Sequence, residues 1–141
     1  MDSEHSERFL EATSAAAARD NTSPKSILHR AYDALLRGDY DGFGEYLAAD
    51  IELHIHGFGG VDGSWKGRKD VLAATRRNFD KLSGQIPELE GMISEGDSVA
   101  VLVRETGTFK ASGDNYNIRA VQWFTFANGK IKKIDQIVAS V

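Results

Sequence analysis

The stretch that decides the fold is Gly38–Val71, which reads GDYDGFGEYLAADIELHIHGFGGVDGSWKGRKDV. Gly38 predicts the end of a helix, because glycine commonly occupies the left-handed position that follows the last turn. A short helix is expected over about Asp41–Ala48. A strand is expected over Ile51–His56, because its apolar residues alternate with polar ones. A glycine-rich loop then leads to a further helix that begins after Gly67.

The residues on either side of this stretch complete an α+β pattern. Ser23 and Pro24 predict a helix start, because serine caps free amide groups and proline suits the first turn. Apolar residues then recur at helical spacing as far as Leu36. The helix after Gly67 is expected to end near Ser83, and the rest of the chain reads as strands over 85–94, 98–110, 115–126 and 130–138. Three helices followed by consecutive antiparallel strands predict an α+β fold.

This order of elements resembles the NTF2-like superfamily, in particular its SnoaL-like polyketide cyclase and ketosteroid isomerase-like members. Ala49–Glu52 and Trp65–Arg68 carry the resemblance most directly, and it extends over Ile27–Val138. It implies an NTF2-like (cystatin-like) cone, in which a curved antiparallel sheet wraps around three N-terminal helices and encloses a pocket. Because this fold hosts enzymes, binding modules and association domains, the resemblance alone selects no reaction.

Length and charge narrow the class of protein. The 141 residues suffice for one domain, expected over 23–141, after an N-terminal extension over 1–22 that we expect to be mobile or loosely docked. A net charge of −4 argues against nucleic acid or an anionic membrane as the main partner. The absence of cysteine excludes disulfides and thiol chemistry. No segment reads as a signal peptide or a membrane span, so we expect a cytoplasmic protein.

Two expected strands are apolar on both alternating faces. They are Val99–Val103 and Val121–Phe126. An antiparallel sheet with one wet face should alternate between apolar and polar residues, so both faces are expected to be covered. Helices can cover only one face. We therefore expect a homodimer through the open face, as in the family, with Val121 and Trp123 as candidate contacts.

The resemblance implies a mostly apolar pocket suited to a small hydrophobic molecule. Five aromatic residues of the expected helices and the glycine-rich loop region are candidates to line this pocket. The alternative for each is ordinary core packing. These residues are Tyr32, Phe43, Phe58, Trp65 and Phe79.

The pair His54 and His56 is a candidate for acid–base chemistry, because imidazoles titrate near neutral pH. Two residues apart on a strand, the histidines share one face. A metal site would need a third ligand, and glycines and a phenylalanine follow the pair instead. A surface or interface position is the third alternative. If Ile51, Leu53 and Ile55 face the core, the histidines face away from it unless a bulge changes the register.

The last two strands carry further polar candidates. SnoaL-like cyclases carry an acid on the last strand, and the resemblance makes Asp135 the nearest match as a general acid or base. By alternation, Ile134 and Gln136 share one face, while Ile131, Lys133 and Asp135 share the other. Arg119 could bind an acidic substrate group or form a surface ion pair. Gln122 and Gln136 are candidate polar groups of the pocket.

Ketosteroid isomerases use a tyrosine of the first helix and an aspartate of the first strand. The equivalent positions here read Ala31 and Ile55, and Tyr32 is displaced by about 100° around the helix. The sequence therefore argues against steroid isomerisation.

The first hypothesis for the function is an enzyme of isomerase, cyclase or hydratase (lyase) type. It would act on a hydrophobic carbonyl compound by general acid–base chemistry, and no cofactor is implied. The alternative is a non-catalytic ligand-binding or dimerisation module.

Overall fold

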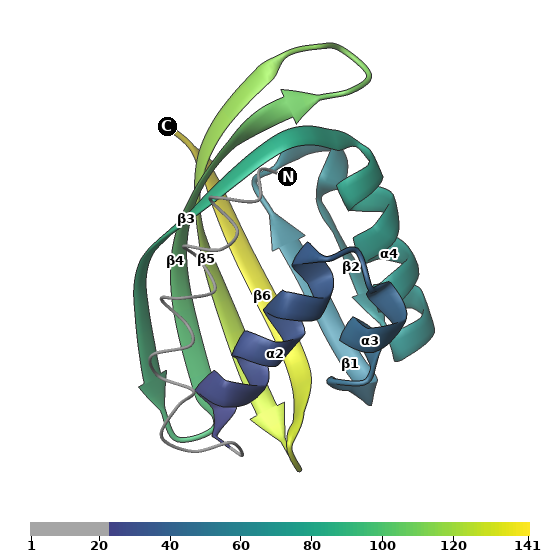
Figure 1. Ribbon diagram of the computed structural model, residues 1–141, viewed down its shortest axis with the longest axis vertical. Coiled ribbons are helices and arrows are strands. Elements are labelled where there is room, and N and C mark those ends of the chain that lie inside the picture. Colours follow the sequence, from purple (N-terminus) through teal and green to yellow (C-terminus); the bar gives the residue numbers. More distant parts are fainter. Residues whose placement is uncertain (1–22) are drawn as a thin grey trace.

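The protein folds as an open, curved six-stranded sheet with its helices on one side (Figure 1). The structure is a computed structural model and describes residues 23–141, so the expected N-terminal extension lies outside the described residues. The helices are α2 (Pro24–Leu36), α3 (Tyr40–Gly44) and α4 (Arg68–Asp80), with a short 3-10 helix η1 (Gly59–Val61). The strands are β1 (Leu47–His56), β2 (Gly63–Lys66), β3 (Leu82–Glu95), β4 (Ser98–Phe109), β5 (Asn115–Ala127) and β6 (Lys130–Ser140).

Helix α2 begins and ends at the residues that the sequence marks. The Ser23 side chain accepts a hydrogen bond from the amide of Ser26, and Pro24 occupies the first turn. The helix closes at Leu36, and Gly38 then adopts a φ of +75°, where a residue with a side chain is strained. These two signals set the bounds of α2, and its apolar residues Leu28, Ala31 and Tyr32 set the face that is buried.

The strands follow the order β2-β1-β6-β5-β4-β3. Strands β3 to β6 pair antiparallel in sequence order, which confirms the expected succession. The β1–β6 pair is parallel, because the chain leaves β1 through α4 and returns beside it only at the end. Strand β1 begins at Leu47, earlier than expected, because α3 already ends at Gly44. Strand β2 had been expected as loop.

Register shifts bend the sheet at several points. One lies between Leu89 and Gly91 on β3, and another lies at Thr125 and Phe126 on β5. Bulges of this kind increase local bending and twist. The second shift also changes β6, where Ile131 and Ile134 both face the core. The expectation that Ile131 shares a face with Asp135 is therefore wrong, because strict alternation fails across the bulge.

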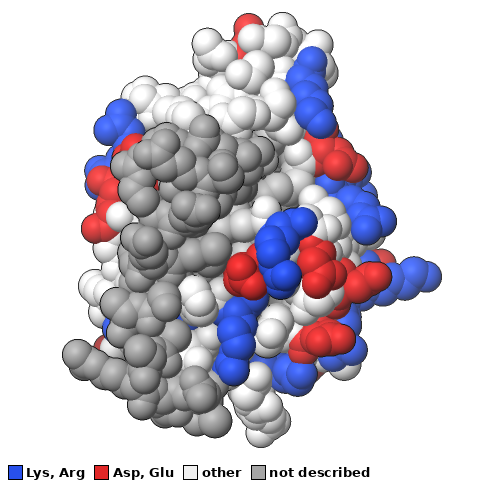
Figure 2. Space-filling model, in the orientation of Figure 1, with Lys and Arg blue, Asp and Glu red and all other residues white. Residues whose placement is uncertain are grey.

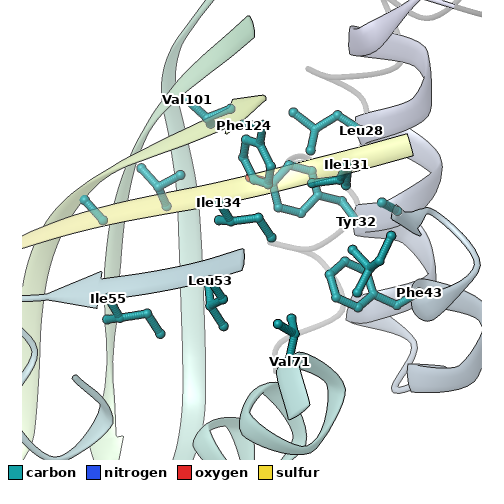
Figure 3. Close-up of a cluster of buried hydrophobic side chains, with 14 of the residues drawn as sticks. Leu28, Tyr32, Phe43, Leu53, Ile55, Val71, Val101, Phe124, Ile131 and Ile134 are labelled. Carbon is teal, nitrogen blue, oxygen red and sulfur yellow. The ribbon is translucent and has the colours of Figure 1, made fainter. Parts of the chain in front are cut away.

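The hydrophobic core lies between the helices and the concave face of the sheet. Figure 3 shows Leu28 and Tyr32 from α2 directed toward Phe124 and Ile134 on the sheet. The opposite face, which we call the open face, carries no helix of the described chain and exposes several large apolar side chains. They are Ile93 (72% exposed), Ile137 (62%), Trp123 (49%) and Val121 (39%).

The surface over α3 and α4 mixes both signs of charge, with Lys and Arg side chains lying among Asp and Glu (Figure 2). Within residues 23–141, no helix is long and apolar enough to cross a membrane.

Candidate functional site

A cavity of about 160 Å³ opens between α2, α4 and the concave face of the sheet. Its walls are mainly apolar and aromatic, contributed by Leu28, Leu35, Phe43, Leu53, Ile55, Phe58, Phe79, Val103, Phe124 and Ile134. The polar side chains in the lining are Tyr32, Thr75, Asn78, Gln85, Glu105, Gln122 and Gln136. A mainly apolar cavity with a few polar groups is typical of a site for a small molecule.

Among residues 23–141, Glu105 is the one acidic residue in the cavity lining. Strand β4 places it there by simple alternation, because Val99, Val101 and Val103 are buried on the same face. The Tyr116 hydroxyl donates to Glu105 Oε2 over 2.7 Å, and the Gln85 side chain also hydrogen-bonds this carboxyl group. Two neutral donors therefore hold Glu105 from the side of the sheet.

Gly107 makes room for the Tyr116 hydroxyl. These two residues pair across β4 and β5, and a Cβ atom on Gly107 would lie 2.5 Å from the hydroxyl oxygen. That separation is far below a normal contact, so a side chain here would displace the tyrosine. The absence of a side chain at Gly107 thus allows Tyr116 to reach Glu105.

Burial raises the pKa of the Glu105 carboxyl group above its ordinary value. The hydrogen bonds from Tyr116 and Gln85 lower this pKa, but by less than burial raises it. No Lys, Arg or His side chain of residues 23–141 lines the cavity to supply an opposing charge. Burial and the nearby Glu105 charge also raise the pKa of the Tyr116 hydroxyl, so Tyr116 remains a proton donor to this carboxyl group.

A second polar group is formed by Tyr32, Gln122 and Gln136. The Tyr32 hydroxyl donates to Gln122 Oε1, and Gln122 Nε2 donates to Gln136 Oε1 over 3.3 Å. Gln122 and Gln136 face each other across β5 and β6, and the Tyr32 ring packs edge-on against Phe124. Burial raises the pKa of Tyr32, so its hydroxyl remains protonated.

The two polar groups occupy different parts of the cavity. Gln122 pairs with Val101, which lies four residues before Glu105 on β4. At about 3.3 Å per residue, their backbone positions are about 13 Å apart along the sheet. An elongated ligand would suit a cavity whose polar groups start from backbone positions this far apart.

Most of the expected lining residues do line the cavity. Tyr32, Phe43, Phe58, Phe79, Gln122 and Gln136 are among its wall residues. Ala31 and Ile55, which stand where ketosteroid isomerases carry their catalytic pair, also line it as apolar groups. An acid is present in the cavity, but it comes from β4.

The two histidines lie on the open face, because Leu53 and Ile55 take the inward positions of β1. Their rings stack with centroids 6.5 Å apart, and His54 Nδ1 lies 2.8 Å from the Ser64 hydroxyl. No bulge reverses them into the cavity. The expectation that His54 and His56 act on a ligand there is corrected accordingly.

Three other candidates also lie outside the cavity. Asp135 faces the open side and approaches Lys133 Nζ to 3.4 Å, because Ile134 and Gln136 take the inward positions. Arg119 on the same face pairs with Glu90, with Nε 3.0 Å from Oε1. Trp65 packs beside Arg77 at the β2 edge, 5.9 Å from the guanidinium to the ring centre. None of the three is among the residues that line the cavity.

The sequence contains a signal that places Glu105 on the inward face of its strand. The valines at 99, 101 and 103 mark the inward face of β4, and continuing the alternation by one step reaches Glu105. Gln85 and Tyr116 are harder to find, because their contact with Glu105 depends on the pairing of three strands. Among residues 23–141, no cluster of three or more His, Cys, Asp or Glu side chains could hold a metal ion.

Fold and cavity together define the class of protein. The SnoaL-like domain model matches residues 28–134, so this chain belongs to the SnoaL-like family. This confirms the NTF2-like superfamily predicted from the sequence. No functionally curated protein matches the chain.

Solved structures share the fold. An NTF2-like protein from Burkholderia xenovorans LB400 is 21% identical, with a TM-score of 0.73 over 82% of this chain and 88% of that one. TerC, co-crystallised with polyporic acid, is 21% identical, with a TM-score of 0.70 over 83% and 92%. A protein of ketosteroid isomerase-like fold from Catenulispora acidiphila DSM 44928, in complex with trimethylamine, is 14% identical, with a TM-score of 0.66 over 78% and 82%.

Proposed function

We propose that this protein binds a small, mainly apolar carbonyl compound in the cavity and that Glu105 acts on it as a general base and acid. The reaction would be of the isomerase, cyclase or hydratase type. The observation that carries the proposal is a carboxyl group of raised pKa in the wall of an apolar cavity. A carboxyl group whose pKa is raised above its ordinary value is a stronger base when ionised and can both accept and return a proton.

In the proposed step, the Glu105 carboxylate takes a proton from a carbon conjugated to the substrate carbonyl. The C–H bond breaks, an O–H bond forms at Glu105, and the electron pair of the C–H bond moves to the carbonyl oxygen as an enolate. The Gln136 amide is the candidate donor to that oxygen, because the Tyr32 hydroxyl already donates its one proton to Gln122. The proton then returns from Glu105 to another carbon, which restores the carboxylate. A conjugated, elongated substrate would span the two polar groups.

Exchange of substrate hydrogen for deuterium tests this proposal. Carbonyl compounds with conjugated, mainly apolar skeletons are incubated with the protein in deuterated water and followed by proton NMR. We expect wild-type protein to catalyse exchange in at least one of them. Glu105→Gln should lower the rate about 100- to 10,000-fold, the usual contribution of a general acid–base group.

Asp135→Asn is the matched control, because it removes a carboxylate from the open face of the same sheet. It should leave the exchange rate unchanged. Exchange that survives Glu105→Gln, or that falls equally in both variants, would contradict the assignment.

Non-catalytic binding is the second candidate function. It is favoured by the presence of Ala31 and Ile55 in the cavity wall, where related isomerases carry reactive side chains. The ligands of TerC and of the C. acidiphila protein lend support to small-molecule binding by proteins of this fold. Saturable binding of carbonyl compounds without any Glu105-dependent exchange would select this candidate.

Homodimerisation through the open face is also part of the proposal. Val121 and Trp123 on β5 and Ile137 on β6 lie close together there, because Val121 pairs with Ile137 in the sheet register. A contiguous exposed apolar area of this kind is typical of a contact surface. A cytoplasmic location and the lack of a nucleic-acid partner remain predictions from the sequence.

A further inference from the structure

We propose that the cavity also binds protonated amines, with the ammonium group seated at Glu105. The inference relies on Glu105 as part of the cavity wall, as the proposed function does, but it requires no catalytic step. An amine bound in this way would occupy the base and act as a competitive inhibitor of any proton transfer there.

The first argument is the charge balance around Glu105 within the described residues. Carboxylates in an apolar environment are unfavourable unless a cation or several hydrogen bonds compensate them. Here Tyr116 and Gln85 provide only neutral donors, and no cationic side chain of residues 23–141 lines the cavity. An ammonium group from a ligand would supply the opposing charge that the described chain does not.

The second argument is the aromatic wall near this carboxyl group. Phe58 lines the cavity, and its ring centre lies 5.2 Å from that of Tyr116, the residue that donates to Glu105. Phe109 closes the same cluster, with its ring centre 5.7 Å from that of Phe58. The faces of aromatic rings attract cations, so Phe58 would add to the attraction of an ammonium group at Glu105.

The loop that carries Phe58 is fixed from both sides. The Asp62 carboxylate accepts hydrogen bonds from the amides of Gly57 and Phe58, and Lys81 Nζ donates to the Gly60 carbonyl oxygen over 2.8 Å. The aromatic wall is thus held in place before a ligand arrives. Beyond it, the remaining apolar lining would accept the hydrocarbon part of the amine.

Calorimetric titration with three ligands of similar shape tests the inference. The ligands are phenethylamine, phenethyl alcohol and phenylacetate, which carry a cationic, a neutral and an anionic group. We expect the amine to bind about tenfold more tightly than the alcohol, because hydrogen bonds to charged groups are stronger than neutral ones. Phenylacetate should bind most weakly. Equal affinities for the amine and the alcohol in wild-type protein would overturn the inference, whatever the variants do.

The Glu105→Gln variant identifies the group that recognises the cation. It should lose about tenfold in amine affinity and leave the affinity for phenethyl alcohol unchanged. Glu90→Gln, on the open face, should change neither value and controls for general attraction to an acidic protein. An equal loss of amine affinity in both variants would contradict seating at Glu105.

These outcomes can be separated from those of the proposed function. Amine binding that depends on Glu105, without deuterium exchange in any carbonyl compound, would support this inference and contradict the catalytic role. Exchange that depends on Glu105, without preference for the amine, would do the reverse.

Discussion

The two faces of the sheet use the same strands but differ in kind. On the open face, charged and titratable side chains lie close to one another, as Arg119 does with Glu90 and Lys133 does with Asp135. On the concave face, polar residues are few, and Glu105 lies among apolar and aromatic groups, where its partners within residues 23–141 are the neutral Tyr116 and Gln85. Burial among apolar groups shifts the pKa of a carboxyl group, whereas an exposed ion pair contributes little to stability. The concave face is therefore where chemistry is expected.

The largest difference between the faces should appear in stability. Ile51 is fully buried on the concave side of β1, whereas Ile137 on β6 is 62% exposed on the open face. We expect Ile51→Ala to lower the free energy of unfolding by about 2–5 kcal/mol, because it leaves a cavity in the core. Ile137→Ala should change it by less than about 0.5 kcal/mol.

Urea unfolding followed by circular dichroism, at concentrations where the protein is monomeric, gives both values. Similar losses in the two variants would contradict the placement of the core on one side only.

Association should respond to the open face instead. Trp123 is half exposed and pairs with Asp135 in the sheet, so Trp123→Asp would place a second carboxylate in an apolar contact surface. We expect the dimer dissociation constant to rise at least about 30-fold, as for a central aromatic contact worth about 2 kcal/mol. Sedimentation velocity over a range of concentrations measures this.

Trp123→Phe keeps the apolar surface and should retain the dimer. A wild-type protein that stays monomeric at every concentration would remove this part of the proposal.

A smaller effect should follow from removing one hydroxyl group on the concave side. Tyr116→Phe deletes the donor to Glu105, and we expect a loss of about 1 kcal/mol in the free energy of unfolding. Because this hydrogen bond lowers the pKa of Glu105, the Glu105 carboxyl group of the variant should have a still higher pKa than in wild type.

Thr108→Val, on the same hairpin, removes an exposed hydrogen bond to Asn115 and serves as the comparison. Denaturant titration should show a smaller loss for this variant than for Tyr116→Phe. An equal loss would mean that the Tyr116 contact contributes nothing beyond a surface hydrogen bond.

The smallest expected difference between the two faces is in how the stability of the protein depends on pH. A carboxyl group whose pKa is higher in the folded state binds a proton more tightly there than in the unfolded chain. Its contribution to stability therefore falls as the pH rises from the ordinary glutamate pKa through the raised value of Glu105. We expect Glu105→Gln to remove this decline and to be more stable than wild type at neutral pH.

Thermal unfolding between about pH 4 and 8 shows whether stability falls with rising pH in wild type and not in Glu105→Gln. Glu90→Gln, which breaks an exposed pair with Arg119, should leave the decline in place. If stability still declines with rising pH in Glu105→Gln, the decline is due to another group.

Much of the fold could be predicted because its signals are local. The Ser23 cap, the Gly38 turn and the alternation of β1 each depend on a few neighbouring residues, and the structure confirms all three. The position of Ile131 could not be predicted, because it depends on a bulge set by pairing with β5.

The site was harder to predict because residue type proved a poor guide to position. Histidines and an aspartate suggest chemistry wherever they occur, yet alternation places His54, His56 and Asp135 on the open face. The same rule, applied along β4, would have placed Glu105 in the cavity. The partnership of Glu105 with Tyr116 and Gln85 joins β3, β4 and β5, so it required the three-dimensional structure.

The most direct test of the account is a carbon-13 NMR titration of the Glu105 carboxyl group, assigned by its loss in Glu105→Gln. We predict that it titrates above the ordinary range for glutamate and that added phenethylamine lowers its apparent pKa, since a cation favours the carboxylate. A Glu105 signal that titrates at the ordinary glutamate value, with or without the amine, would contradict the central claim that this cavity holds a proton-active carboxyl group.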